Sequence, residues 1–478
     1  MKLLNLCLTS IFLQYAIAAP TIEQPDVQLA YREEEPLKTL HTRSVPIGDN
    51  LEAREIILPL APSVDPFYQP PAGFESQPVG AILRYRKRTN PFGIVVVPVK
   101  IKDVWQLLVR SEDTFGNPIA IVTTVYVPYN ANPNKVLSFQ PAEDSASVDC
   151  APSYAFQLGA QVQTILTSQL EQIFSQAGLG EGWYVISPDY EGPKAAFGAG
   201  KLAGKAVLNS VRALFNSANF TGVSPEAKVT YWGYSGGSIA TGWASLLAPT
   251  YAPDLTDNNV GFALGGIVAD VEHTAEANMG TAFAGLIFAA INGLCAEYPD
   301  LNTYVNQKVF PKMMNKFRSP TKQCLIETIP SFLFNGWTQY FVDGAKTLYS
   351  PEVRNVTSGI NMVTSNLVPK SPMFFYNSKN DGIIPAKDAD SLYNRLCPAG
   401  VPIQYQQSML GDHITQYVTG AGSAFSWIKD RLNDKPQTSC NRKYTLTNIL
   451  TPGGITGFSD IVITAIFSAL QKPIGPIF

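Results

Sequence analysis

One serine set between glycines constrains this chain more than any other feature of its sequence. Residues 229–243 read VTYWGYSGGSIATGW, so Ser235 falls where a β-rich run gives way to a helix-forming one. Gly233 and Gly237 supply the spacing Gly-x-Ser-x-Gly, because side chains at these positions would collide in a sharp strand-to-helix turn. The pattern predicts a nucleophile elbow, which exposes the serine hydroxyl to a substrate. A Gly/Ser loop is the alternative interpretation.

The order of β-rich and helical runs around this motif predicts an α/β fold. Short runs at 81–85, 93–99, 104–109 and 119–127 predict an antiparallel opening to a sheet. Beyond them strands alternate with helices, which implies parallel β-α-β units. The expected strands are 136–139, 183–187, 228–232, 266–270, 373–376 and 401–405, and the expected helices are 154–177, 201–216, 238–247 and 386–396.

A long segment between the strands breaks this alternation. It contains the uncharged stretch Ala282–Ile291 and several helical stretches without clear strands, which predicts a helical cap inserted into the sheet domain. The expected organisation of the chain is a signal peptide at 1–18, an N-terminal arm or propeptide at 19–64, a first core segment at 65–271, the cap at 272–365, and a second core segment with a C-terminal flap at 366–478.

The start of the chain indicates export. Residues 1–20 read MKLLNLCLTSIFLQYAIAAP, in which one lysine, an apolar stretch and the small-x-small site Ala16-Ile17-Ala18 predict a secretory signal peptide. No later uninterrupted apolar run is long enough to cross a bilayer, so no transmembrane segment is expected. Two sequons, at Asn219 and Asn355, fit a glycosylated extracellular protein.

Composition argues against several other classes of function. The formal net charge of −3 gives no reason to expect a nucleic acid partner. The cysteines that remain after loss of the signal peptide show no Cys-x-x-Cys spacing, and there are only 3 histidines, so neither a metal site nor a cofactor is expected. In an oxidising compartment these cysteines suggest two disulfides and one free thiol.

The base that would activate Ser235 is found by elimination among the three histidines. His41 lies in the polar arm, and His273 could face the cap or simply lie on the surface. His413 follows the last expected strand and precedes a helix, where the chain order Ser…Asp…His of α/β-hydrolases places the base. We therefore expect His413 to take the proton of Ser235.

The acid that orients the base is expected in the loop after strand 373–376. Asp381 lies there, although Asn380-Asp381-Gly382 is also a strong turn signal. Asp412 is a poor rival because it adjoins His413, and Asp388 and Asp390 lie on an expected helix. The oxyanion hole should use the backbone N–H of Gly236 together with a second backbone N–H from the loop 140–145, for which we favour that of Asp144.

With these residues placed, the chain resembles the fungal secreted lipases of the Candida lipase A type, α/β-hydrolases with a helical cap. The matching stretches are Asp65–Glu75, Cys150–Tyr154, Pro188–Gly192, Gly233–Gly237, Asn380-Asp381 and Gly411–His413, and the likeness covers roughly residues 65 to 478. The resemblance implies Ser235 as nucleophile, Asp381 as acid, His413 as base, Asp144 and Gly236 as the oxyanion hole, and triacylglycerol as substrate.

We also expect two specific disulfides. Cys150 should pair with Cys324, which ties the oxyanion loop to the cap, and Cys397 with Cys440, which clamps the segment that carries His413. Cys295 is left as a free, buried thiol, and the resemblance says nothing about it.

The leading hypothesis is therefore a secreted, monomeric lipase that forms an acyl-enzyme and needs no cofactor. A carboxylesterase or acyltransferase acting on soluble esters is the alternative within enzymes, and an inactive binding module of the same fold is an alternative from another class. Two apolar stretches, Ala282–Ile291 in the cap and Ile461–Leu470 near the C-terminus, could together form an acyl-binding region that opens at a lipid surface.

Overall fold

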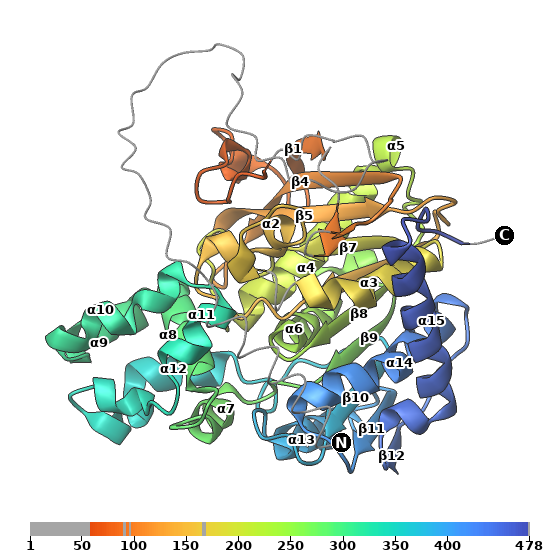
Figure 1. Ribbon diagram of the computed structural model, residues 1–478. Coiled ribbons are helices and arrows are strands. Elements are labelled where there is room, and N and C mark those ends of the chain that lie inside the picture. Colours follow the sequence, from red (N-terminus) through yellow and green to blue (C-terminus); the bar gives the residue numbers. More distant parts are fainter. Residues whose placement is uncertain (1–57, 89–91, 95–96, 165–168, 477–478) are drawn as a thin grey trace, which may run out of the picture. The chain divides into compact units, whose positions relative to one another are not determined.

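A ten-stranded sheet organises the chain, seen in Figure 1 for a computed structural model that describes residues 58–88, 92–94, 97–164 and 169–476. The expected signal peptide and most of the expected arm lie outside these residues. The strands are β1 (Ile82–Lys87), β4 (Asp103–Glu112), β5 (Pro118–Val127), β6 (Lys135–Gln140), β7 (Tyr184–Pro188), β8 (Lys228–Tyr234), β9 (Asn259–Gly265), β10 (Met373–Ser378), β11 (Ile403–Ser408) and β12 (Asn441–Thr445).

The sheet is antiparallel at one end and parallel over the rest, as the sequence predicts. Its order is β1-β4-β5-β7-β6-β8-β9-β10-β11-β12. β1, β4, β5 and β7 are joined by antiparallel pairings, and every pairing from β7 to β12 is parallel. β8 lies between β6 and β9, so its carboxyl end, which leads to Ser235, sits in the middle of the sheet. The α/β-hydrolase fold class is confirmed.

Helices cover both faces of this sheet and create two separate cores. Neighbouring residues of one strand point to opposite faces, so Tyr231 belongs to one core and Trp232 to the other. The first core contains α4 (Gly200–Asn216), α6 (Gly236–Tyr251) and α13 (Ala386–Leu396). The second contains α3 (Leu170–Gly180), α14 (His413–Leu432) and α15 (Pro452–Ala469).

The segment between β9 and β10 contains helices and no strand longer than a single bridge among its described residues. They are α7 (Val271–Ala277), α8 (Ala284–Glu297), α9 (Pro299–Lys308), α10 (Met314–Phe317), α11 (Leu325–Ser331) and α12 (Pro351–Gly359). Figure 1 shows them gathered together, apart from α14 and α15. They have their own aromatic core, in which the rings of Phe288 and Phe332 stack 3.9 Å apart.

Two sequence predictions of secondary structure are wrong. The expected helix 154–177 is broken into α2 (Pro152–Ala155), a short 3-10 turn and α3, since Gly159 has a φ of 84° and interrupts the helix. The expected strand 266–270 is instead a loop, and the strand β9 ends at Gly265 because Gly266 has a φ of 49°. The strand β12 at the sheet edge is an addition that the sequence pattern does not predict.

The C-terminal helix α15 is unusually apolar. By length and composition it is the one helix among the described residues that could cross a membrane, and the expectation of no transmembrane segment stays a prediction. The apolar run is hard to detect because serine, threonine and glycine interrupt it, while Asp460 is its only charged residue. α15 packs along α14, where Gly422 and Gly457 bring the two backbones into direct contact.

This close approach makes Gly457 intolerant of a side chain. A Cβ at Gly457 would lie 2.8 Å from the carbonyl carbon of Gly422, so we expect Gly457→Ala to destabilise the fold by about 1–3 kcal/mol, as overpacked sites do. Gly359→Ala is the matched control, because Gly359 is also helical and its Cβ would meet nothing within 4 Å. Chemical denaturation measures both, and equal stability of the two variants would contradict the prediction.

Candidate active site

Ser235 occupies a strained turn between β8 and α6. Its φ is 52° and its ψ −122°, a conformation that side chains rarely adopt, and its N–H donates to the carbonyl of Gly265 at 3.0 Å. A side chain at Gly233 would collide with the carbonyl of Gly237, and one at Gly237 with the carbonyl of Gln140. Both glycines of the motif are therefore required sterically, for the reason the sequence suggests.

The structure brings Ser235, His413 and Asp381 together from three separate loops. Nε2 of His413 lies 2.9 Å from Oγ of Ser235, and Nδ1 of His413 lies 2.7 Å from Oδ2 of Asp381. The other oxygen of Asp381 accepts the N–H groups of Ile383 at 3.0 Å and Ile384 at 2.8 Å. These two backbone N–H groups fix the orientation of the carboxyl, and the Asp381 side chain is fully buried.

The rival acids lie elsewhere. Asp412 caps α14, and its carboxylate accepts the N–H of Thr415 at 2.8 Å. Asp388 contacts Nδ1 of His273 at 2.8 Å, while Asp390 accepts from Tyr405 and Arg442. None of the three contacts His413 by a hydrogen bond found in the described residues.

The side chain of Asp144 lies against Gly236, the residue that follows the serine. The φ of Asp144 is 50°, and a Cβ placed on Gly236 would overlap its Oδ1, so the carboxyl lies directly against the first residue of α6. Oδ1 is buried without a hydrogen-bond partner among the described residues. Burial raises the pKa of Asp144 to about 7, although the nearby His413 lowers it in part. A carboxyl in this state can carry a proton and donate a hydrogen bond near neutral pH.

Other buried carboxyls surround the loop that carries Asp144. Burial, together with repulsion by neighbouring carboxylates, raises the pKa values of Glu143 and Glu191 well above their usual range. Glu171 accepts the N–H of Ala142 at 2.9 Å, and burial raises the pKa of this carboxyl to about 8. Several carboxyl groups whose pKa values are raised by burial therefore lie close to the loop that carries Asp144.

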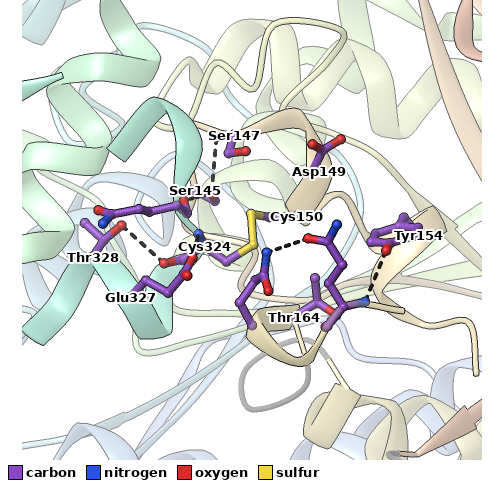
Figure 2. Close-up of a disulfide and its surroundings, with 12 residues drawn as sticks. Ser145, Ser147, Asp149, Cys150, Tyr154, Thr164, Cys324, Glu327 and Thr328 are labelled. Carbon is purple, nitrogen blue, oxygen red and sulfur yellow. Dashed lines mark hydrogen bonds between the residues drawn. A yellow bond between two sulfur atoms is a disulfide. The ribbon is translucent and has the colours of Figure 1, made fainter. Parts of the chain in front are cut away.

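A disulfide joins the same loop to the cap. Figure 2 shows Cys150 bonded to Cys324 at the start of α11, with Ser145 and Ser147 beside it. Oγ of Ser145 donates to the carbonyl of Gln323 at 3.0 Å, so a hydrogen bond accompanies the covalent link. A second disulfide joins Cys397 to Cys440, and Cys295 is free and buried. These are the pairs expected from the sequence.

An apolar cavity of about 120 Å³ opens beside Ser235 and runs into the cap. Asp144, Ser235 and Gly236 line it at the sheet, and the lining in the cap is mostly aliphatic or aromatic, including Leu286, Ile287, Ala290, Ile291, Trp337 and Val356. The cap stretch singled out in the sequence therefore lines this cavity. The C-terminal stretch does not, since α15 packs on α14 and α3 instead.

Two positions that support this site are not evident from the sequence pattern. Gly266 leaves room for the imidazole, because a Cβ there would lie 2.7 Å from Cε1 of His413. The hydroxyl of Tyr234 donates to the carbonyl of His413 at 2.7 Å. One sequence feature could have indicated the role of Gly266. The pair Gly265-Gly266 follows an apolar run, and such a pair is typical of the end of a strand and not of its interior.

The chain is similar to known proteins of one family. Residues 156–440 match the family model described as secretory lipase. The chain is 42% identical over 433 residues to Lipase 4 of Candida albicans, which covers 88% of this chain and 93% of that protein. It is 39% identical over 446 residues to Lipase A of Arthroderma benhamiae, covering 90% and 94% respectively.

A solved structure agrees over the same region. The X-ray structure of Candida antarctica lipase A in its closed state superposes with a TM-score of 0.78 at 29% sequence identity. The superposition covers 88% of this chain and 100% of that one. The resemblance seen in the sequence motifs is confirmed.

Proposed function

The chain belongs to the secretory lipase family and is a secreted lipase, and on this premise we propose that it hydrolyses triacylglycerol esters through Ser235, His413 and Asp381. The observation that carries the proposal is the continuous pair of contacts from Ser235 Oγ to His413 Nε2, 2.9 Å, and from His413 Nδ1 to Asp381 Oδ2, 2.7 Å. This is the geometry that proton transfer from a nucleophilic hydroxyl requires.

Each residue has a distinct role in the proposed reaction. His413 takes the proton of Ser235 as the serine oxygen attacks the ester carbonyl, and Asp381 holds the imidazole in the orientation that this transfer needs. The tetrahedral intermediate expels the alcohol, which receives the proton from His413 and leaves an acyl-enzyme. Water then attacks this acyl-enzyme by the same route and releases the fatty acid.

The proposed oxyanion hole combines the N–H of Gly236 with Asp144. Gly236 begins α6, so its N–H is one of the free donors at a helix N-terminus. The carboxyl of Asp144 lies against Gly236, and with a pKa of about 7 it can donate its proton to the developing oxyanion. The Asp144 side chain is thus proposed as the second donor, in place of the backbone N–H favoured from the sequence.

The proposed enzyme is an exported, glycosylated protein with a cap inserted into its core. Residues 1–18 would be removed on export, and residues 19–64 would be an N-terminal arm or propeptide. Asn219 and Asn355 are both exposed and would be glycosylated in an extracellular, monomeric enzyme. The division into core at 65–271 and 366–478 and cap at 272–365 is retained in the proposal.

Substitution of the triad tests the proposed roles. Ser235→Ala and His413→Ala should each lower kcat by about 3 orders of magnitude or more, and Asp381→Ala by somewhat less, with losses that do not add in the double variants. Hydrolysis of p-nitrophenyl butyrate measures these losses. A fluorophosphonate probe should label the native chain and Asp390→Ala, label His413→Ala only slowly because its serine lacks the base, and fail to label Ser235→Ala. Asp390→Ala is the control, and near-native activity of Asp381→Ala would overturn the acid assignment.

The pH dependence of kcat tests Asp144. Its raised pKa keeps the carboxyl protonated below about pH 7, so kcat should fall as pH rises through that value and the donor is lost. Asp144→Asn keeps a donor at every pH and should lose this alkaline decline, whereas Asp144→Ala should be slow throughout. Asp189→Asn is the control and should keep the alkaline decline. Burial raises the pKa of the Asp189 carboxyl to about 7 as well, but this carboxyl accepts hydrogen bonds from Ser153 and not from the substrate. An unchanged decline in Asp144→Asn would exclude the proposed donor.

The cap cavity is the proposed acyl-binding site, which its apolar lining supports. Ala290→Phe places a ring in this cavity and should lower kcat/KM for esters of long fatty acids by about tenfold or more, while acetate esters change little. Ala282→Phe, in the same stretch but outside the lining, should leave both unchanged. A native enzyme fully active on soluble short esters and inactive on emulsified triacylglycerol would instead favour the carboxylesterase alternative.

A further inference from the structure

The helix α15 presents an unusual surface to solvent. Four of its residues and the Leu470 that caps it are between 38% and 62% exposed, and all of them are large and aliphatic: Ile455, Val462, Ile463, Ile466 and Leu470. At about 100° per residue they fall within an arc of roughly 100°, so they form one stripe along the helix. We call these five residues the α15 face. Surface helices normally turn such a stripe toward the core.

The opposite side of α15 already has its partners. Gly454, Gly457, Ile461 and Ser468 are buried, and Gly457 contacts the backbone of Gly422 on α14. Thr464 packs against Gly180 at the end of α3. Only 22% of the helix is buried, although it is apolar enough for a membrane span. Since one side is fixed to α14 and α3, the helix cannot cross a bilayer without leaving the fold.

The scarcity of charged and polar residues on α15 favours a lipid surface over a protein as the partner of this face. Asp460 is the only ionisable residue of α15, and it forms an ion pair with Lys429 at 3.3 Å. Ser459 is the only polar residue within the stripe, so the face offers almost no directional hydrogen bonds. A lipid surface requires none, whereas specific protein interfaces usually include polar contacts around an apolar centre.

Further exposed apolar side chains lie on the segment before α15 and on the loop that carries His413. Leu446 and Leu450, just before α15, are exposed, and so are Leu410 and Ile414 on either side of His413. The N–H of Leu410 donates to the carbonyl of Leu446 at 2.9 Å, which holds the two segments side by side. Exposed apolar side chains therefore flank the proposed catalytic base as well as α15.

We propose that the α15 face is a permanently exposed docking surface for lipid, which lies flat on a droplet or bilayer while the cap cavity receives the acyl chain. The proposal rests on the secreted lipase function, because that activity brings the enzyme to a lipid surface. It separates two tasks that the sequence-based expectation combines: the cap stretch binds one acyl chain, and α15 binds the aggregate. Attachment is then independent of any movement of the cap.

Flotation with lipid tests this surface directly. We expect the native secreted protein to float with phosphatidylcholine vesicles and with triolein emulsion, and to do so equally at low and high salt because no charge pair is involved. The double variant I463S/I466S should bind at least about tenfold more weakly, since each side chain loses its apolar contact with lipid. Its kcat/KM on monomeric p-nitrophenyl butyrate should match that of the native protein.

The matched control places the same substitutions on the cap. F334S/V342S removes two exposed apolar side chains from the cap, 71% and 58% exposed, and should leave flotation unchanged. Loss of flotation in this variant but not in I463S/I466S would overturn the proposal in favour of the cap. A native dimer that I463S/I466S converts to monomer would assign the face to a second copy of the chain. Loss of soluble-ester activity in Ser235→Ala tests the catalytic proposal separately.

Discussion

The close packing of backbone around Ser235 is the constraint on which the rest of the structure depends. The turn from β8 into α6 is possible only because Gly233 and Gly237 lack side chains that would strike neighbouring carbonyls. The positive φ of Ser235 is a local cost of about 1–3 kcal/mol, which a buried central strand and a long buried helix can offset. In return the hydroxyl is aimed out of the sheet, and the N–H of Gly236 is left free at a helix start.

The second and third catalytic groups reach this turn because parallel strands end at the same edge. β8, β9, β10 and β11 are neighbours in the sheet, so the loops after them meet there. Asp381 follows β10, and His413 follows β11 as the first residue of α14. The loop after β9 supplies no member of the triad. Its Gly266 lacks a side chain and so leaves room for the imidazole of His413. An α/β sheet with this strand order thus assembles residues that lie far apart in the sequence.

The sequence is most informative where the chemistry depends on a local pattern. The elbow glycines, the positions of Asp381 and His413 and the alternation of strands and helices are all evident in short stretches, and the strands β6, β8, β10 and β11 lie close to their expected bounds. Prediction fails where a distant neighbour decides. The expected strand 266–270 does not form because Gly266 has a φ of 49°, and a side chain at this position would collide with the imidazole of His413. The direction of the Asp144 side chain depends on a positive φ that no local pattern indicates.

Hydropathy alone could not distinguish the roles of the two apolar stretches, one of which lines a cavity while the other is exposed to solvent. Ala282–Ile291 and Ile461–Leu470 have similar composition, and from the sequence both are expected at one acyl-binding region. In the structure α8 is enclosed by other cap helices and lines a cavity, whereas α15 packs along one side only, against the glycines of α14 and the end of α3. Small residues at 454 and 457 allow that contact to be close but bury little area, so the large aliphatic residues are left on the other side. Burying each of those side chains in lipid would contribute roughly 1.5–3 kcal/mol to the free energy of attachment. This contribution is absent while the side chains remain in water.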